Sequence, residues 1–194
     1  MTDIAVIGEP DHLRSVLNQR CGYQQLGKAC KFCAVESWWA GYREKTPRHV
    51  AEVAEAAYQE GMAKHVTLST GTKLSPGKGL EDLVETAKEI QKRAKVTLTL
   101  NFEPVTDWGL LRSLLEEGKA AGATTALCNI ECFDENLRES IMPLKGKNTI
   151  EDYRKVWKIC TDIFAHNEVY TMVIAGLGES DESILEGVEM AASM

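Results

Sequence analysis

The chain has 194 residues, of which 44% are hydrophobic and 26% are charged, and its formal net charge is −7. This length and composition are typical of a single globular domain with a sizeable core. The negative net charge argues against a nucleic-acid-binding or anionic-membrane-binding surface.

The location of the chain is predicted from two further features. No apolar stretch of about 18 residues is present, and the N-terminus lacks the basic and apolar segments of a secretory signal. We therefore expect no membrane span and a cytoplasmic location. In a reducing compartment the six cysteines are better explained as metal ligands or buried thiols than as disulfides.

Strand-like and helix-like segments alternate along the chain. Five segments rich in β-branched and apolar residues predict strands: Ser15–Gln19, Val66–Thr70, Val96–Phe102, Thr124–Glu131 and Glu168–Gly176. Apolar residues at helical spacing predict helices that begin at Pro47 and near Leu80, Leu110, Ile150 and Asp181. Thr149 and Asp152 resemble a capping box before the fourth of these helices.

This alternation predicts βα units and a parallel sheet with right-handed crossovers. We find no internal repeat, low-complexity segment or linker, so one domain is expected. Residues 1–14 are assigned to an N-terminal flank and residues 15–194 to the core domain.

Polar residues gather on one face of the predicted strands. Thr97, Thr99 and Asn101 share a face of the third strand, and Asn129 and Glu131 share a face of the fourth. A curved, barrel-like sheet with a cavity inside and helices on its apolar outer face explains this pattern. The alternative is that threonine is present because it is a good strand former.

Three cysteines form a C-x8-C-x2-C cluster: Cys21, Cys30 and Cys33. This type of spacing is shared by zinc and iron–sulfur sites. A structural zinc site usually has four ligands, and the nearest further candidate is His49, at the start of a helix. Three ligands with one open position suit a reactive iron–sulfur cluster. From spacing alone, iron–sulfur, zinc and buried thiols all remain open.

The cysteine loop, with Phe32 before its last cysteine and a βα-repeat chain after it, resembles that of the radical S-adenosylmethionine (SAM) enzymes. The resemblance implies that Cys21, Cys30 and Cys33 hold three irons of a 4Fe–4S cluster, whose fourth iron binds SAM. Phe32 would pack near the adenine. The family's usual spacing is C-x3-C-x2-C, and Leu26 stands where its first cysteine would fall.

Three later motifs extend this resemblance. The segment STGT, made of Ser69, Thr70, Gly71 and Thr72, is similar to the one that presents backbone carbonyls to the SAM amino group, although its usual acidic residue is missing. The segment NIECFD resembles the ribose-binding one, with Glu131 as the best match. The segment VIAGLGE is similar to the adenine-contact motif of the biotin-synthase-like branch, with Met172 replacing its leading glycine. The implied cofactor-binding residues are Phe32, Ser69, Thr70, Gly71, Thr72, Asn101, Asn129, Glu131, Ile174 and Gly176.

The resemblance also implies a fold and an activity. The fold is an α/β, partial (β/α)6-type barrel with about five βα units, and the chain stops at Met194, where a sixth strand is expected. The activity is reductive cleavage of SAM to a 5′-deoxyadenosyl radical that abstracts hydrogen from a small-molecule substrate, with flavodoxin or ferredoxin as the reductant. The alternative function is a zinc-stabilised or electron-transfer iron–sulfur module without SAM chemistry.

Several other residues receive structural interpretations. Cys128, Cys132 and Cys160 are expected to be core thiols. Trp38 and Trp39 either shield the cluster or pack against the first helix. Lys145 and Lys147 either belong to a solvated loop or neutralise the SAM carboxylate. Glu103 either caps the turn at Pro104 or faces the cavity.

Overall fold

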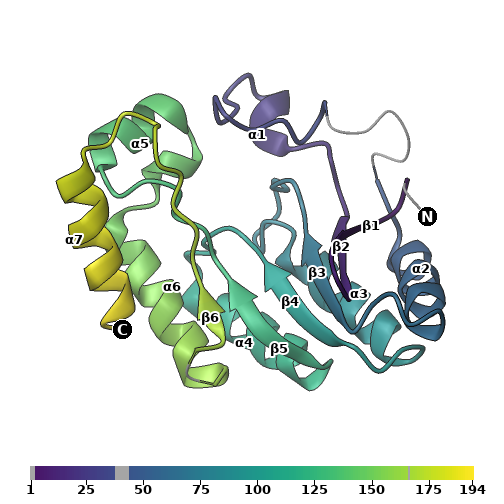
Figure 1. The fold of residues 1–194 in the computed structure, drawn as a ribbon. Helices are drawn as coiled ribbons and strands as arrows, with labels where there is room; N and C mark the ends of the chain where they lie inside the picture. Colours follow the sequence, from purple (N-terminus) through teal and green to yellow (C-terminus); the bar gives the residue numbers. More distant parts are fainter. Residues whose placement is uncertain (1–2, 38–43, 166) are drawn as a thin grey trace.

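The computed structural model of the chain describes residues 3–37, 44–165 and 167–194, so that Trp38 and Trp39 lie outside the described residues. Its centre is a six-stranded sheet with the strands in sequence order (Figure 1). β1 pairs antiparallel with β2, and all the later pairs are parallel. The strands are β1 (Val6–Glu9), β2 (His12–Val16), β3 (His65–Ser69), β4 (Thr97–Asn101), β5 (Ala123–Leu127) and β6 (Val169–Tyr170).

The helices cover the outer face of this sheet. Figure 1 shows α2, α3, α4 and α6 along that face, with α1 and α5 beyond the carboxyl ends of the strands. The predicted alternation and the α/β partial-barrel fold are therefore confirmed. The helices are α1 (Gly22–Gln25), α2 (Pro47–Gln59), α3 (Leu80–Gln91), α4 (Trp108–Ala120), α5 (Glu135–Ile141), the 3-10 helix η1 (Lys145–Lys147), α6 (Ile150–Ile163) and α7 (Asp181–Ala192).

Helix starts follow local signals in the sequence. Pro47 begins α2, and the Thr46 side chain accepts a hydrogen bond from the His49 N–H. The predicted capping box of Thr149 and Asp152 is present at the start of α6. These caps satisfy N–H groups that a helix leaves without intrahelical partners, so the helix boundaries are determined locally.

Alternate residues of each strand face either the hydrophobic core or a cavity. Val66, Leu68, Leu98 and Leu100 are fully buried and belong to the main hydrophobic cluster under the helices. The intervening residues of β3 and β4 line a cavity on the opposite face. The predicted polar inner face is confirmed for Thr97, Thr99 and Asn101, because each of them lines this cavity.

Three strand boundaries differ from those expected. β2 begins at His12, and residues 6–9, which the sequence assigns to the flank, form an antiparallel edge strand. β5 ends at Leu127, and Glu131, which adopts a positive φ of 61° that is uncommon for a residue with a side chain, lies beyond its end. β6 spans only Val169–Tyr170, followed by an isolated parallel bridge between Glu131 and Val173.

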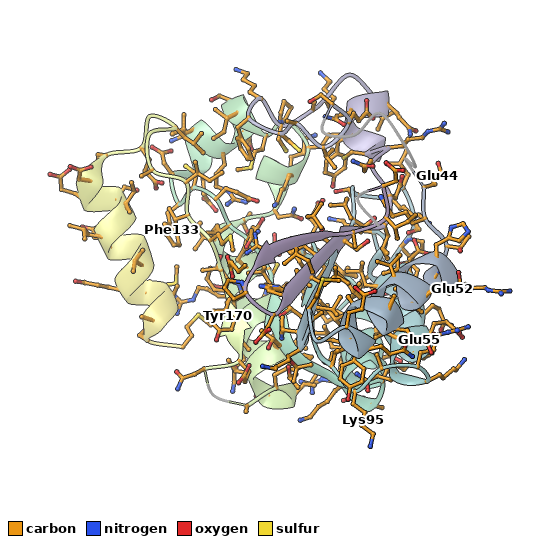
Figure 2. The ribbon with its side chains drawn as sticks, turned by 45° about the vertical axis from the view of Figure 1, so that its right-hand side comes forward. Glu44, Glu52, Glu55, Lys95, Phe133 and Tyr170 are labelled. Carbon is orange, nitrogen blue, oxygen red and sulfur yellow. The ribbon has the colours of Figure 1, made fainter. Side chains whose placement is uncertain are left out.

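The last helix packs closely over the loop after β5. Phe133 lies beside α7 (Figure 2). A Cβ at Gly187 would lie 2.2 Å from the Phe133 ring, so that only glycine permits this approach. No helix among the described residues is long and apolar enough to cross a membrane.

The contact between α4 and β4 provides a test of this packing. A Cβ at Gly118 would lie 2.6 Å from the Leu100 Cδ1, in the core, whereas at Gly109 of the same helix the nearest atom is 3.6 Å away. We expect Gly118→Ala to lower the free energy of unfolding by about 1–2 kcal/mol relative to Gly109→Ala, because it overpacks the core. Urea unfolding measures both variants, and equal stabilities would contradict this packing.

Candidate active site

The candidate site lies at the carboxyl ends of the parallel strands. Ser69 pairs with Asn101, and Asn101 with Leu127, so the loops that follow β3, β4 and β5 leave the sheet at one level. Cys21 follows β2 on the same side, at the start of α1. Ligands of open α/β sheets bind at this end of the strands.

Glycine allows the cysteine loop to pack directly on the loop after β3. The Gly71 N–H donates to the Asn18 carbonyl at 2.6 Å, and the Gly22 N–H donates to the Thr72 carbonyl at 2.7 Å. A Cβ at Gly71 would lie 2.8 Å from the Asn18 oxygen and 3.2 Å from the Cys21 Cα. The STGT segment thus holds the first cysteine in place, and the Thr72 carbonyl is already engaged.

The second half of the cysteine loop packs against α5. The Lys31 N–H donates to the Ile141 carbonyl at 2.8 Å, and Cys30 contacts the small apolar cluster formed by Cys132, Ile141 and Met142. Cys30 is half-buried and Cys33 is exposed. The loop therefore spans from β3 to α5 across the end of the sheet.

The three cysteines do not form a preassembled metal site. Among the residues that the structure describes, no three His, Cys, Asp or Glu side chains lie close enough together to hold a metal ion. Burial raises the pKa of the Cys30 thiol to about 12, although the nearby Lys145 opposes the shift. Since the thiolate is the metal ligand, binding at Cys30 requires a metal to displace the proton.

Glu131 is held at the centre of the site by backbone contacts to the segment after β6. Its N–H donates to the Met172 carbonyl at 2.9 Å, and its carbonyl accepts from the Ile174 N–H at 2.8 Å. Its Oε1 accepts a 2.6 Å hydrogen bond from the Lys145 Nζ. Its Oε2 is buried and has no hydrogen-bond partner, and a buried acceptor in that state is a candidate for a donor that the protein itself does not supply.

Charge and burial oppose each other in the Glu131–Lys145 pair. Burial raises the pKa of the Glu131 carboxyl, and Lys145 offsets part of the increase. Burial acts to lower the pKa of Lys145, but Tyr153, Glu131 and Glu103 outweigh it and the pKa is raised. The interpretation of Lys145 as a solvated loop residue is therefore wrong, since its side chain is only 14% exposed. Lys147 is exposed, as expected for a residue of a solvated loop.

Arg138 holds the peptides on both sides of Glu131. Its fully buried guanidinium donates to the Ile130 and Cys132 carbonyls, each at 2.9 Å, and to the Asn148 carbonyl at 3.0 Å. It also lies 4.7 Å from the centre of the Tyr153 ring, which stabilises its charge. The left-handed conformation of Glu131 is thus maintained from outside the loop.

Glu103 connects the loops of the site more extensively than its sequence position indicates. Its carboxylate accepts hydrogen bonds from Tyr23 at 2.5 Å, Thr72 at 2.6 Å and Lys78 at 3.0 Å. Burial acts to raise the pKa of Glu103, but Lys78 and Lys145 outweigh it and the pKa is lowered. The turn-cap interpretation is therefore incomplete, because Glu103 joins the cysteine loop to the STGT segment. Glu103 lies two residues after Asn101 and so falls on the same face of an extended segment, which is the feature of the sequence that could have indicated this role.

The remaining predicted residues occupy varied positions around this centre. Asn129 Oδ1 is buried without a hydrogen-bond partner, and Asn101 lines the cavity. Phe32 is 36% exposed. Gly176 has a φ of 92°, which favours glycine. Glu179, of the same motif, accepts the N–H groups of Phe133 and Asp134 and so joins the loops after β5 and β6.

The three remaining cysteines are confirmed as core thiols. Cys128, Cys132 and Cys160 are each 0% exposed. Burial raises the pKa of all three, to about 12 for Cys160 and about 11 for Cys132. They therefore remain protonated and apolar at neutral pH, and they support the loops from below.

The comparison with family models matches the radical SAM superfamily over residues 20–191. The chain belongs to this superfamily. Its members use a 4Fe–4S cluster and SAM as cofactors. The match begins just before Cys21 and ends within α7, so it contains every residue of the candidate site.

Solved structures of radical SAM enzymes share the fold of the chain. Methylornithine synthase (PylB) aligns with 12% identity and a TM-score of 0.71, over 94% of this chain and 50% of that one. The hydrogenase maturase HydG aligns with 16% identity and a TM-score of 0.69, over 94% of this chain and 39% of that one. HydG from Carboxydothermus hydrogenoformans aligns with 17% identity and a TM-score of 0.70, over 94% of this chain and 40% of that one. The chain thus spans half or less of each structure, and no curated protein matches it.

The Arg138 contacts predict a large stability effect. Arg138→Met keeps the apolar stem but removes the donors to three buried carbonyls, each of which costs about 1–3 kcal/mol when left unsatisfied. We expect the free energy of unfolding in urea to fall by about 3 kcal/mol. Arg154→Met, on the exposed face of α6, is the control and should change it by less than about 0.5 kcal/mol. Equal effects would show that Arg138 does not hold the loop.

Proposed function

We propose that the chain forms the catalytic core of a radical SAM enzyme, with Cys21, Cys30 and Cys33 as ligands of a 4Fe–4S cluster. When bound, the reduced cluster supplies the electron that cleaves SAM to a 5′-deoxyadenosyl radical, which abstracts hydrogen from substrate. We further propose a small-molecule substrate, a flavodoxin- or ferredoxin-type reductant and a cytoplasmic location.

The donor set fits this cluster. The loop supplies three thiols and no fourth cysteine, which suits an iron–sulfur cluster with one position open to SAM. Gly71 and Ile141 hold the two ends of the loop at the carboxyl edge of the sheet. The raised pKa of Cys30 means that this thiol remains protonated until metal binds.

The unpartnered Oε2 of Glu131 is the observation that carries the SAM proposal. Two vicinal ribose hydroxyls are donors of the kind that this buried carboxylate lacks. Lys145 holds the other oxygen and fixes the orientation of the carboxylate. Asn129, two residues before Glu131, offers a second buried acceptor. We assign Ile174, Gly176 and Phe32 to the adenine of SAM. We assign Ser69–Thr72 and Asn101 to the rest of the SAM molecule.

Tyr23 and Glu103 hold the cysteine loop against the STGT segment. Tyr23 lies two residues after Cys21, and its hydroxyl donates to the same carboxylate that binds Thr72 and Lys78. Displacing the cysteine loop would therefore leave a buried carboxylate with fewer donors. This penalty favours the conformation in which the loop stays over the end of the sheet.

Anaerobic reconstitution tests the cluster proposal. We expect brown protein that contains iron and sulfide and that forms 5′-deoxyadenosine from SAM and dithionite. Substituting Cys21, Cys30 and Cys33 together with Ala should abolish both the iron content and the product, whereas Cys160→Ala should retain them. A colourless zinc protein would contradict the proposal and favour the zinc-stabilised module.

Substituting Glu131 tests SAM binding separately. Glu131→Gln removes the charge that strengthens the hydrogen bonds to ribose, and such a bond contributes about 1.5–3 kcal/mol. We expect the dissociation constant of SAM, measured by equilibrium binding to reconstituted protein, to rise about tenfold or more. Glu139→Gln, exposed on α5, is the control. Unchanged affinity with full iron content would remove Glu131 from the site.

A further inference from the structure

A cavity of about 1030 Å³ occupies the inner face of the sheet, beneath the candidate SAM site. The strand pairing arranges its polar lining in layers. Arg14 pairs with Thr67, Thr67 with Thr99, and Thr99 with Thr125. Glu168 continues this middle layer at the start of β6, where it accepts a 2.9 Å hydrogen bond from the Thr125 hydroxyl.

The size of the threonine side chains keeps the middle layer open. Comparable layers inside (β/α)8 barrels are filled mainly by bulky branched residues. Thr67, Thr99 and Thr125 line the cavity, and their hydroxyl groups bond to His12, His65 and Glu168 respectively. The volume lies at the upper end of the range typical of small-molecule pockets.

Two histidines line the cavity at the amino-terminal ends of the strands, here called its floor. The His12 Nε2 lies 2.8 Å from the Thr67 hydroxyl, and the ring nitrogens of His65 lie 2.6 and 2.8 Å from the hydroxyls of Thr97 and Thr99. Burial lowers the pKa of His65, so its imidazole is neutral at neutral pH. His65 therefore completes the hydrogen bonds of the floor without adding positive charge.

The charged groups of the cavity are unevenly paired. At one edge, Arg14 forms a 2.5 Å ion pair with Glu9, and the His12 Nδ1 lies 3.3 Å from the same carboxylate. At the other edge, Glu168 forms no ion pair with any residue that the structure describes, and Thr125 is its hydrogen-bond donor. The carboxylate of Glu168 is thus the charge in the lining that lacks a counter-ion.

The layer above Glu168 is largely apolar. Leu127 and Tyr170 pair with each other one step nearer the SAM site, and Val16 and Met172 also line the cavity at its upper part. Tyr170, labelled in Figure 2, lies on β6, and Glu168 directly precedes this strand. Two residues along a strand correspond to about 7 Å, so a ligand bound at Glu168 by one end would pass an apolar wall before it reached the SAM site.

We propose that this cavity binds a small primary amine, whose ammonium group pairs with Glu168 and whose apolar stem extends past Leu127 toward the SAM site. As an assignment of substrate class, this inference rests on the proposed function. An anionic ligand is disfavoured, since Arg14 already has Glu9 as its partner and Glu168 would repel a second carboxylate.

The test compares pentylamine, 1-pentanol and pentanoate, which share one stem and differ in charge. Calorimetric titration of the full chain should show pentylamine binding about tenfold or more tightly than either of the others, as expected for a charged hydrogen bond. Glu168→Gln should remove this preference, whereas Glu182→Gln, exposed on α7, should preserve it.

Four outcomes would overturn the proposal: equal binding of all three probes, tightest binding of pentanoate, an unchanged preference in Glu168→Gln, or no binding of pentylamine. If Glu168→Gln does not fold, the comparison of the three probes on the unsubstituted chain still tests whether the cavity prefers an amine. Iron content and SAM binding, measured on the same preparations, report on the proposed function separately. A preference for the amine without iron or SAM binding would therefore retain the pocket and reject the proposed function.

Discussion

In-register pairing of the parallel strands is the constraint on which the rest of the structure depends. It places residues that lie two apart on each strand in layers across β2, β3, β4 and β5. The even-numbered positions of β3 and β4 are apolar and pack beneath the helices, and the odd-numbered positions face the cavity. The same pairing brings the ends of the strands to one level, where the loops of the candidate site meet. A slip of one residue would exchange the core with the cavity.

Close backbone approach and buried charge together hold the loops at that edge. Gly71 allows the segment before Cys21 to contact the loop after β3. Glu103 then connects segments that are distant in sequence through its side-chain donors. Arg138 connects the loop after β5 to the end of η1 through backbone carbonyls. Each buried charge is costly to bury without partners, so the site is stable only with its loops in contact. Glu131 has one carboxylate oxygen bound by Lys145 and the other buried without a hydrogen-bond partner.

Local signals predicted the parts of the fold that depend on local chemistry. Pro47 and the Thr149–Asp152 pair marked helix starts correctly, and alternation along Val96–Phe102 predicted the inner polar face. Extending the fourth predicted strand to Glu131 was wrong, because the strand ends at Leu127. Glu131 lies in the loop beyond it in a left-handed conformation, held by contacts to Arg138 and to the segment after β6 that the sequence does not reveal. The solvated interpretation of Lys145 failed for the same kind of reason: its partner Glu131 is distant in sequence.

By itself the sequence determined the βα alternation, the two-faced strands, the cysteine spacing and the resemblance to the radical SAM family, since each depends on residue type and on spacing along the chain. Only the tertiary structure decided which polar groups are paired. It brought the donors Tyr23, Thr72, Lys78 and Asn148 to the Glu103 carboxylate. It also enclosed Lys145 and left Glu168 in the cavity without a counter-ion among the residues that the structure describes. The physical reason is that burial and ion pairing depend on distances between segments, and those distances are set by the packing of the whole sheet.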